Sequence, residues 1–288
     1  MGKLGLGAVQ FGMDYGINNS RGQVPYGEVF EILDRAVGAG IEVIDTAYAY
    51  GVSQKIIGEY VKRKNPNFKI VTKISKEDQI DESIEGLEEI LGIKPYAVLF
   101  HSFEDYKGNS GGLDLLINKK KDGKIEKIGF SLYYPSQLEY IFDNDIPADI
   151  IQVPYSVFDR RFEGLFAKAK KKGMEIHVRS IFLQGVVFKS PETIIREPLS
   201  ILRDKVKCLQ DISKEIGVSV SNICVAFAAS NEFIDNVLVG VDTLENFNEI
   251  IEYEKNKQIV QENSEELLKL EESNEEVLLP FNWKEMGD

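Results

Sequence analysis

The chain has 288 residues, of which 43% are hydrophobic, so it can bury a substantial core and is not typical of a disordered protein. Its 47 acidic and 34 basic residues give a net charge of −13, which disfavours binding to nucleic acids or to anionic membrane surfaces. The N-terminus lacks a signal-peptide pattern, and no stretch has the roughly 18 apolar residues of a membrane span. We therefore expect a cytoplasmic protein with no nucleic-acid or membrane partner.

Cysteines and histidines are scarce. Cys208 and Cys224 lie outside any metal-binding or redox spacing, and we expect both to be buried, reduced side chains. His101 and His177 are the two histidines, too few for a multi-histidine metal centre. The sequence therefore predicts no metal site.

Short apolar runs alternate with stretches of helical periodicity, the pattern of βα units and a parallel sheet. In the clearest helical stretch, one face carries Val29, Ile32, Leu33, Ala36 and Val37. Eight strands in roughly 240 residues, without a linker, favour a single (β/α)₈ TIM barrel over a doubly wound α/β sheet with a second domain. The predicted strands are Lys3–Leu6, Ile41–Asp45, Lys69–Lys73, Tyr96–Phe100, Lys127–Phe130, Ile150–Val153, Glu175–Arg179 and Val237–Val239.

Two stretches interrupt this alternation. The loop over residues 7–24 is long and rich in glycine, and the 57 residues between Arg179 and Val237 leave room for extra helices around Ile201–Ile216 and Ser219–Ser230. Residues 245–288 hold 13 acidic and 4 basic residues and form an acidic, amphipathic helical extension whose apolar side chains are expected to pack on the barrel. We treat residues 1–288 as one domain with additional C-terminal helices, acting as a monomer or weak homo-oligomer.

Three polar residues hold the same position at the ends of successive predicted strands. Asp45 and Lys73 are 28 residues apart, and Lys73 and His101 are another 28 apart. Because the carboxyl ends of barrel strands surround a shared pocket, these side chains are expected to meet there. Tyr50 follows in the sequence DTAYAYG, in the loop that the second strand delivers to the same rim.

These four side chains suit the delivery of a proton to a carbonyl oxygen. A tyrosine has a reference pKa of about 10 and needs help to give up its proton near neutrality. We expect the Lys73 ammonium to lower the pKa of Tyr50 by roughly 1–3 units, and Asp45 to hold the lysine. His101 would donate a hydrogen bond to the substrate oxygen or relay the proton. Each of these residues alone has an ordinary structural explanation, but four of them expected at one rim of the barrel favour an active site.

The sequence resembles the aldo/keto reductases, a family of NAD(P)H-dependent carbonyl reductases on the βα barrel. The matching segments are LGLGAVQFG, IEVIDTAYAYG, IVTK, VLFHS, KIGFS, IIQVPYS and LVGVDTLENFNE, which cover residues 3 to about 250. The resemblance implies that Asp45, Tyr50, Lys73 and His101 are a catalytic tetrad, with Tyr50 the general acid in reduction and the general base in oxidation. Tyr48 is the competing tyrosine by proximity, but the family pattern has the acid immediately before the glycine.

The resemblance also implies a binding site for NADPH or NADH. Ser131 and Gln152 match residues that bind the nicotinamide carboxamide, although Leu132 replaces the usual asparagine. Tyr155 matches an aromatic residue that stacks on the nicotinamide ring. The segment RSIFLQGVVF resembles the loop that spans the pyrophosphate. The other implied cofactor contacts are Arg179, Gln184, Gly185, Gly240, Asp242 and Glu249.

The residues after Gly240 bear on which cofactor is preferred. Relatives that prefer NADPH carry an arginine or lysine there, which pairs with the adenosine 2′-phosphate. This chain has Asp242 and Glu245, whose carboxylates repel a 2′-phosphate and accept hydrogen bonds from ribose hydroxyls. We therefore expect a reduced preference for NADPH, with NADH as the favoured candidate. The alternative is that Asp242 only caps the following helix.

The expected substrate is a small carbonyl compound. Aromatic and arginine side chains near the predicted site would suit a sugar, a sugar nucleotide or a small keto acid; they are, with one serine, Phe11, Tyr15, Tyr48, Ser102, Phe103, Tyr133, Tyr134, Arg160, Arg161 and Arg179. Two other functions stay open. One is a Schiff-base aldolase that uses Lys73 as its nucleophile, and the other is a cofactor-binding regulatory protein with low turnover.

Overall fold

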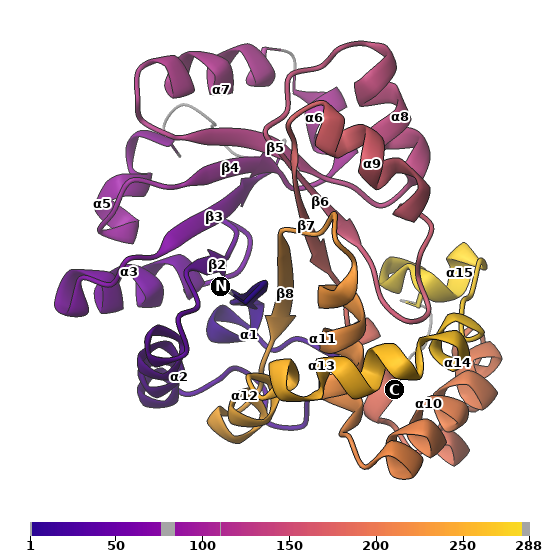
Figure 1. Cartoon of the computed structure of the whole chain (residues 1–288). Helices are drawn as coiled ribbons and strands as arrows, with labels where there is room; N and C mark the ends of the chain where they lie inside the picture. Colours follow the sequence, from indigo (N-terminus) through magenta and orange to yellow (C-terminus); the bar gives the residue numbers. More distant parts are fainter. Residues whose placement is uncertain (1, 76–83, 110, 284–288) are drawn as a thin grey trace.

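The computed structural model describes residues 2–75, 84–109 and 111–283. Eight parallel strands pair in chain order, and β1 pairs with β8 to close a barrel (Figure 1). The (β/α)₈ prediction is confirmed, and every predicted strand end lies within two residues of the observed one. The strands are β1 (Leu4–Gly7), β2 (Val43–Asp45), β3 (Lys69–Ile74), β4 (Ala97–Phe100), β5 (Lys127–Ser131), β6 (Ile150–Pro154), β7 (Glu175–Arg179) and β8 (Asn236–Gly240).

Helices surround the barrel, because each turns an apolar stripe toward the strands. In α2, the predicted stripe is buried except for Val37, which is 46% exposed. The α-helices are α1 (Val9–Gly12), α2 (Tyr26–Gly38), α3 (Ser53–Lys64), α5 (Leu87–Leu91), α6 (Phe103–Gly108), α7 (Gly112–Lys121), α8 (Pro135–Asp143), α9 (Glu163–Lys171), α10 (Arg203–Ile216), α11 (Val220–Ser230), α12 (Leu244–Ile250), α13 (Tyr253–Glu262), α14 (Ser264–Leu268) and α15 (Glu275–Leu278). The 3₁₀ helices are η1 (Leu183–Phe188), η2 (Pro191–Thr193), η3 (Leu199–Leu202) and η4 (Pro280–Trp283).

The long connection between β7 and β8 contains the two predicted extra helices, α10 and α11. Helix α11 is buried along most of its length and packs against α13 of the C-terminal extension (Figure 1). Val260, Leu267 and Trp283 of the extension are buried, whereas Leu268 and Phe281 are exposed. Most of the apolar residues in the extension therefore pack inward, as the amphipathic pattern predicts.

Side-chain alternation along the strands positions the residues of interest. The interior of the barrel holds a small hydrophobic cluster formed by Val43, Val71, Ala97, Leu99, Ile150 and Leu238. Residues two positions apart on a strand face the same side. Asp45, Lys73 and His101 each come two positions after a member of this cluster, so they continue its inward face toward the carboxyl end of the barrel.

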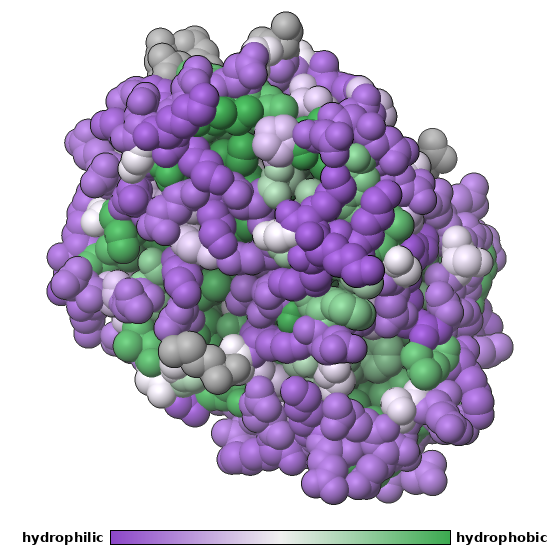
Figure 2. Space-filling view, turned by 45° about the horizontal axis from the view of Figure 1, so that its top comes forward, coloured by the Kyte–Doolittle hydropathy of each residue, from purple (hydrophilic) through white to green (hydrophobic). Residues whose placement is uncertain are grey.

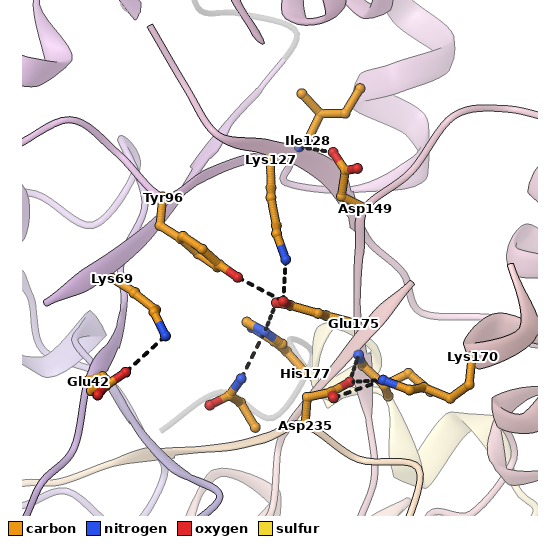
Figure 3. A network of polar contacts seen from close by, with 12 residues as sticks. Glu42, Lys69, Tyr96, Lys127, Ile128, Asp149, Lys170, Glu175, His177 and Asp235 are labelled. Atoms are coloured by element: carbon orange, nitrogen blue, oxygen red, sulfur yellow. Dashed lines mark hydrogen bonds and ion pairs between the residues drawn. The ribbon is translucent and has the colours of Figure 1, made fainter. Parts of the chain in front are cut away.

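A polar network joins the amino-terminal ends of the strands (Figure 3). Glu175 accepts hydrogen bonds from Tyr96 Oη at 2.7 Å and from Lys127 Nζ. Burial alone would raise the pKa of Glu175, but hydrogen bonds with His177, Lys127 and Tyr96 lower it to about 2. Because barrel enzymes carry out chemistry at the opposite face, we interpret this network as a link between β4, β5 and β7. Other pairs in it are Lys69–Glu42, Lys120–Asp149 and Lys170–Asp235.

Hydrophilic side chains cover most of the face in Figure 2, and hydrophobic ones appear in smaller areas between them. Within the described ranges, no single helix has the length and apolarity to cross a bilayer. The segments Leu199–Ile216 and Val220–Ser230, which meet at 96°, reach that length and composition only together. Cys224 is buried in α11, but Cys208 is exposed on α10, so the prediction that both cysteines are buried is wrong for Cys208.

Candidate active site

A cleft of about 650 Å³ opens at the carboxyl ends of the strands. Strand ends and the loops that follow β1, β2, β7 and β8 contribute to its walls. All four predicted catalytic residues and all but one of the predicted cofactor residues line it. These are Asp45, Tyr50, Lys73, His101, Ser131, Gln152, Arg179, Gln184, Gly185, Gly240, Asp242 and Glu249.

A buried ion pair lies at the base of the cleft. The Nζ atom of Lys73 lies 2.8 Å from Oδ1 and 2.7 Å from Oδ2 of Asp45, and its third hydrogen bond goes to the carbonyl oxygen of Thr46 at 3.0 Å. The Lys73 side chain is 1% exposed. Gln152 Nε2 adds a hydrogen bond to Asp45 Oδ1 at 2.7 Å. An ammonium has three hydrogens, so these contacts use every donor of Lys73.

Tyr50 lies beside this ion pair. Lys73 Nζ is 5.0 Å from the centroid of the Tyr50 ring, and the rings of Tyr50 and His101 meet edge to face with centroids 5.7 Å apart. The strands β2, β3 and β4 bring Asp45, Lys73 and His101 to one rim, and the loop after β2 places Tyr50 beside them. No other described tyrosine makes ring contacts with both Lys73 and His101.

The pKa of Tyr50 is shifted in the opposite direction to the one expected from the sequence. Burial and the negative charge of Asp45 raise the pKa of Tyr50 above its ordinary value, whereas we expected Lys73 to lower it. Burial is the larger cause, and Lys73 has no N–H left for the phenol because Asp45 and Thr46 accept all three. Tyr50 is therefore protonated near neutrality, as a tyrosine with the reference pKa of about 10 also is, and it has a proton to donate.

His101 is held as a neutral imidazole. Burial, with the positive charges of Lys73 and Arg179, lowers its pKa from 6.5 to about 4. A neutral imidazole carries one N–H and one lone pair, so it can donate a hydrogen bond to a substrate oxygen without bringing a full charge.

The lowered pKa of His101 predicts a loss of stability in mild acid. Between pH 6.5 and about 4 the unfolded chain binds a proton at this residue that the folded chain does not, so the free energy of unfolding falls as the pH falls through this window. Urea unfolding at about pH 7 and about pH 5 measures the effect, and His101→Gln should show a smaller loss than the wild type. Equal losses in the two proteins would contradict the assignment.

Two glycines bring the first loop close to Tyr50. A Cβ atom on Gly12 would lie 1.8 Å from the carbonyl oxygen of Tyr50, and one on Gly51 would lie 2.4 Å from the carbonyl oxygen of Gly12. Gly51 also has a φ of +54°, which favours glycine. Only residues without a side chain allow this contact, so the α1 segment fixes the backbone that carries Tyr50.

Comparison with known proteins identifies the family. The model of the aldo/keto reductase family matches residues 3–272. The chain belongs to the aldo/keto reductase family. Its members are oxidoreductases that act on carbonyl groups of small molecules and generally use NAD(P)H. No curated protein matches the chain.

Two solved structures illustrate the shared fold. One, from Pseudomonas aeruginosa and assigned as an aldo-keto reductase, has a TM-score of 0.66 and 20% sequence identity, and the match covers 89% of this chain and 90% of that one. The other is the holo form of an aldo-keto reductase from Bacillus halodurans, with a TM-score of 0.68, 17% identity and coverage of 90% and 91%. At these identities the likeness shows the fold alone.

Tyr155 lies outside the cleft of this aldo/keto reductase. Its ring is 2% exposed, lies parallel to the ring of Phe227 at 6.0 Å and also contacts Phe166. Its hydroxyl donates to Glu163 at 2.8 Å. Tyr155 begins the loop after β6, and its side chain turns outward between the barrel and its helices. The prediction that it stacks on a nicotinamide ring is therefore wrong for this structure.

The rest of the cleft fits a dinucleotide. Gln152 Oε1 and Gln10 Oε1 are buried without a hydrogen-bond partner in the described chain, so they are free to accept from a bound ligand. A Cβ atom on Gly240 would lie 2.6 Å from Gln10 Oε1, so the end of the glutamine side chain packs closely over this glycine. Ser180, Leu183 and Gln184, in the loop after β7, have positive φ angles, a strain typical of ligand-binding loops.

At the β8 end of the cleft, the structure adds residues that the sequence reasoning missed. Asn246 and Ser221 line the wall, and Ser221 donates a hydrogen bond to Glu249. Glu245, expected to face the cofactor, is exposed and does not line the cleft. Helical spacing could have identified Asn246, because it lies one turn before Glu249 on the same face of α12.

Of the residues expected near the substrate, Tyr15, Tyr133 and Arg179 line the cleft. Arg160 does not, because it pairs with Glu271. Arg161 does not, because it pairs with Asp159 and Glu275. The others outside the lining are Phe11, Tyr48, Ser102, Phe103 and Tyr134. Among the described residues, no group of His, Cys, Asp and Glu is arranged to hold a metal ion.

Proposed function

We propose that this chain reduces an aldehyde or ketone to an alcohol with a reduced nicotinamide cofactor, and that Tyr50 is the general acid. The observation that carries the proposal is the position of a protonated tyrosine between a neutral histidine and a fully bonded lysine–aspartate pair in the cleft. That arrangement donates a proton at a fixed position near neutral pH.

Each tetrad residue has a separate task in this proposal. Tyr50 holds the proton at its hydroxyl and donates it to the carbonyl oxygen of the substrate. His101 orients that oxygen by a hydrogen bond, and the Lys73–Asp45 pair keeps the floor of the cleft rigid. When bound, the reduced nicotinamide supplies the hydride that the carbonyl carbon accepts. In the reverse direction the phenolate form of Tyr50, which is the product of the donation, takes up the proton of the alcohol.

We assign the cofactor contacts to two parts of the cleft. Ser131 and Gln152 would bind the nicotinamide carboxamide, because Gln152 Oε1 is a buried acceptor without a partner. The strained loop with Gln184 and Gly185 would lie along the pyrophosphate. The adenosine would lie at the β8 end, where Gly240, Asp242, Asn246 and Glu249 line the wall.

The test is a screen of aldehydes, ketones and sugar nucleotides with NADH and with NADPH, followed by the loss of absorbance of the reduced cofactor. Reduction of at least one carbonyl class, with cofactor consumption matched to alcohol formed, supports the proposal. If the protein binds the cofactor but reduces no carbonyl compound with NADH or with NADPH, the result would favour a regulatory function.

We predict that NADH binds at least as tightly as NADPH. The carboxylate of Asp242 lines the cleft, its Oδ1 atom is buried without a partner, and no arginine or lysine of the described chain lines the β8 end. Asp242→Asn should raise the affinity for NADPH by roughly tenfold, because it removes a negative charge facing the 2′-phosphate. Fluorescence titration measures this, with Glu245→Gln as the control outside the cleft. NADPH binding ten times tighter than NADH in the wild type would refute the prediction.

A further inference from the structure

Gln10 lies on α1, and its side chain lines the cleft although the residue is only 9% exposed. Its main-chain carbonyl oxygen accepts a hydrogen bond from Val24 N at 2.9 Å, which ties α1 to the end of the first loop. The end of the Gln10 side chain packs over Gly240, the last residue of β8. A residue from the start of the chain therefore forms part of the β8 end of the cleft.

Gln10 and Asp242 present two hydrogen-bond acceptors to this end of the cleft. Gln10 Oε1 and Asp242 Oδ1 are both buried, and neither has a partner in the described ranges of the chain. The two side chains also contact each other, because burial raises the pKa of Asp242 and a side-chain hydrogen bond from Gln10 opposes that rise. An amide bonds to a carboxylate through its N–H, so this contact uses Nε2 and leaves Oε1 for a ligand.

The surroundings of these two acceptors disfavour an anion. The charge of Arg21 reaches Asp242, but Glu28 binds this guanidinium at 3.0 Å, and Arg21 lies outside the cleft lining. The cations that the structure does place in the lining, Lys73 and Arg179, belong to β3 and β7. A negatively charged group at the β8 end would therefore meet acceptors and a carboxylate, whereas a group with O–H donors would satisfy the two unpaired acceptors.

An adenosine ribose offers such donors. Its 2′ and 3′ hydroxyls are adjacent, and each can donate one hydrogen bond. A 2′-phosphate removes one of these donors and replaces it with a group that carries a charge of about −1.5 to −2 at neutral pH. Two acceptors that face the ribose therefore distinguish NADH from NADPH.

We propose that Gln10 is a specificity-determining residue whose Oε1 atom accepts a hydrogen bond from the 2′-hydroxyl of the adenosine ribose, beside Asp242, and so favours NADH over NADPH. The inference rests on the proposed function, since it requires a nicotinamide dinucleotide in the cleft. It adds to the carboxylate of Asp242 a neutral acceptor that comes from α1.

Removing the acceptor and removing the donor test the same hydrogen bond. Gln10→Met keeps the length of the side chain and removes the amide. Fluorescence titration gives the Kd of NADH and of 2′-deoxy-NADH, in which hydrogen replaces the 2′-hydroxyl of the adenosine ribose. We expect the wild type to bind NADH roughly tenfold more tightly than 2′-deoxy-NADH, the effect of one hydrogen bond. In Gln10→Met the difference should fall below about threefold, because the acceptor is already gone.

NADPH provides a second readout. Gln10→Met should raise the Kd of NADH by roughly tenfold and that of NADPH by less than about threefold, since a phosphate does not donate to this acceptor. Gln10→Glu keeps an acceptor at the same length and adds a negative charge. It should bind NADH within about threefold of the wild type and NADPH at least about tenfold more weakly, and it also serves if Gln10→Met fails to fold.

Gln258→Met is the matched control, because it makes the same substitution at an exposed position of α13 outside the cleft. It should leave every Kd unchanged. Equal affinity of the wild type for NADH and 2′-deoxy-NADH would overturn the inference. Equal weakening of NADH and NADPH by Gln10→Met would also overturn it and would place Gln10 at a part that both cofactors share, such as the pyrophosphate.

The failure of the inference and the failure of the proposed function give different results. In the two outcomes above the wild type still binds a reduced nicotinamide cofactor, so the proposed carbonyl reduction stands. A wild type that binds neither NADH nor NADPH overturns the proposed function and, with it, this inference.

Discussion

Replacing Tyr50 with phenylalanine should lower kcat/KM for carbonyl reduction by about 10²–10⁴-fold, the usual contribution of a general acid. The substitution removes the hydroxyl alone, so the edge-to-face contact with His101 and the position over Lys73 are kept. Affinity for the reduced cofactor should therefore stay within a factor of about two. Steady-state kinetics and fluorescence titration of the same preparation separate the two effects.

Tyr48→Phe is the matched control. Tyr48 lies two residues away in the same loop, but it is 52% exposed and outside the cleft lining. Its loss should change the rate by less than about twofold. If Tyr48→Phe abolished activity while Tyr50→Phe retained it, the proton donor would be misassigned.

Replacing Lys73 with methionine should lower the free energy of unfolding by about 3–5 kcal/mol and abolish most of the reduction. The stability falls because the substitution leaves Asp45 buried without its partner, and one hydrogen bond from Gln152 does not replace the two that Asp45 receives from the ammonium. Urea unfolding and steady-state kinetics measure the two effects.

The double variant Asp45→Asn/Lys73→Met separates stability from chemistry. It removes both charges together, so most of the lost stability should return while activity stays low. A double variant as unstable as Lys73→Met would show that the ion pair is not the cause. The same lysine tests the aldolase alternative, since trapping of a carbonyl substrate on Lys73 by borohydride would indicate a Schiff base. We expect no trapping, because the ammonium is bonded to Asp45 and Thr46.

The fold was predictable because its signals are local. Each strand is a short apolar run between helical stretches, and period-two alternation determines which side chains face the barrel interior. The 28-residue spacing of Asp45, Lys73 and His101 places them at equivalent strand ends, so their meeting at one rim follows from the parallel barrel. The resemblance to the aldo/keto reductases selected Tyr50 over Tyr48. The match to the family model confirms the membership of the family.

Other features of the site depend on neighbours distant in the sequence. Tyr155 shares its segment with cleft residues, yet its ring is buried against Phe166 and Phe227 from α9 and α11. The pKa of Tyr50 depends on its burial and on the charge of Asp45, which binds the lysine that was expected to lower this pKa. A pKa follows from the whole surroundings of a group and not from its nearest partner in the motif.

The sequence alone determined the barrel, the order of its strands and the four residues that meet at its carboxyl end, because backbone periodicity and strand spacing carry that information. The tertiary structure alone decided that the pKa of Tyr50 is raised, that Tyr155 is a core residue and that Arg179 is fixed against Leu132 and Tyr133. These properties arise from burial, from hydrogen-bond saturation and from packing between elements separated by many residues, none of which has a local pattern in the sequence.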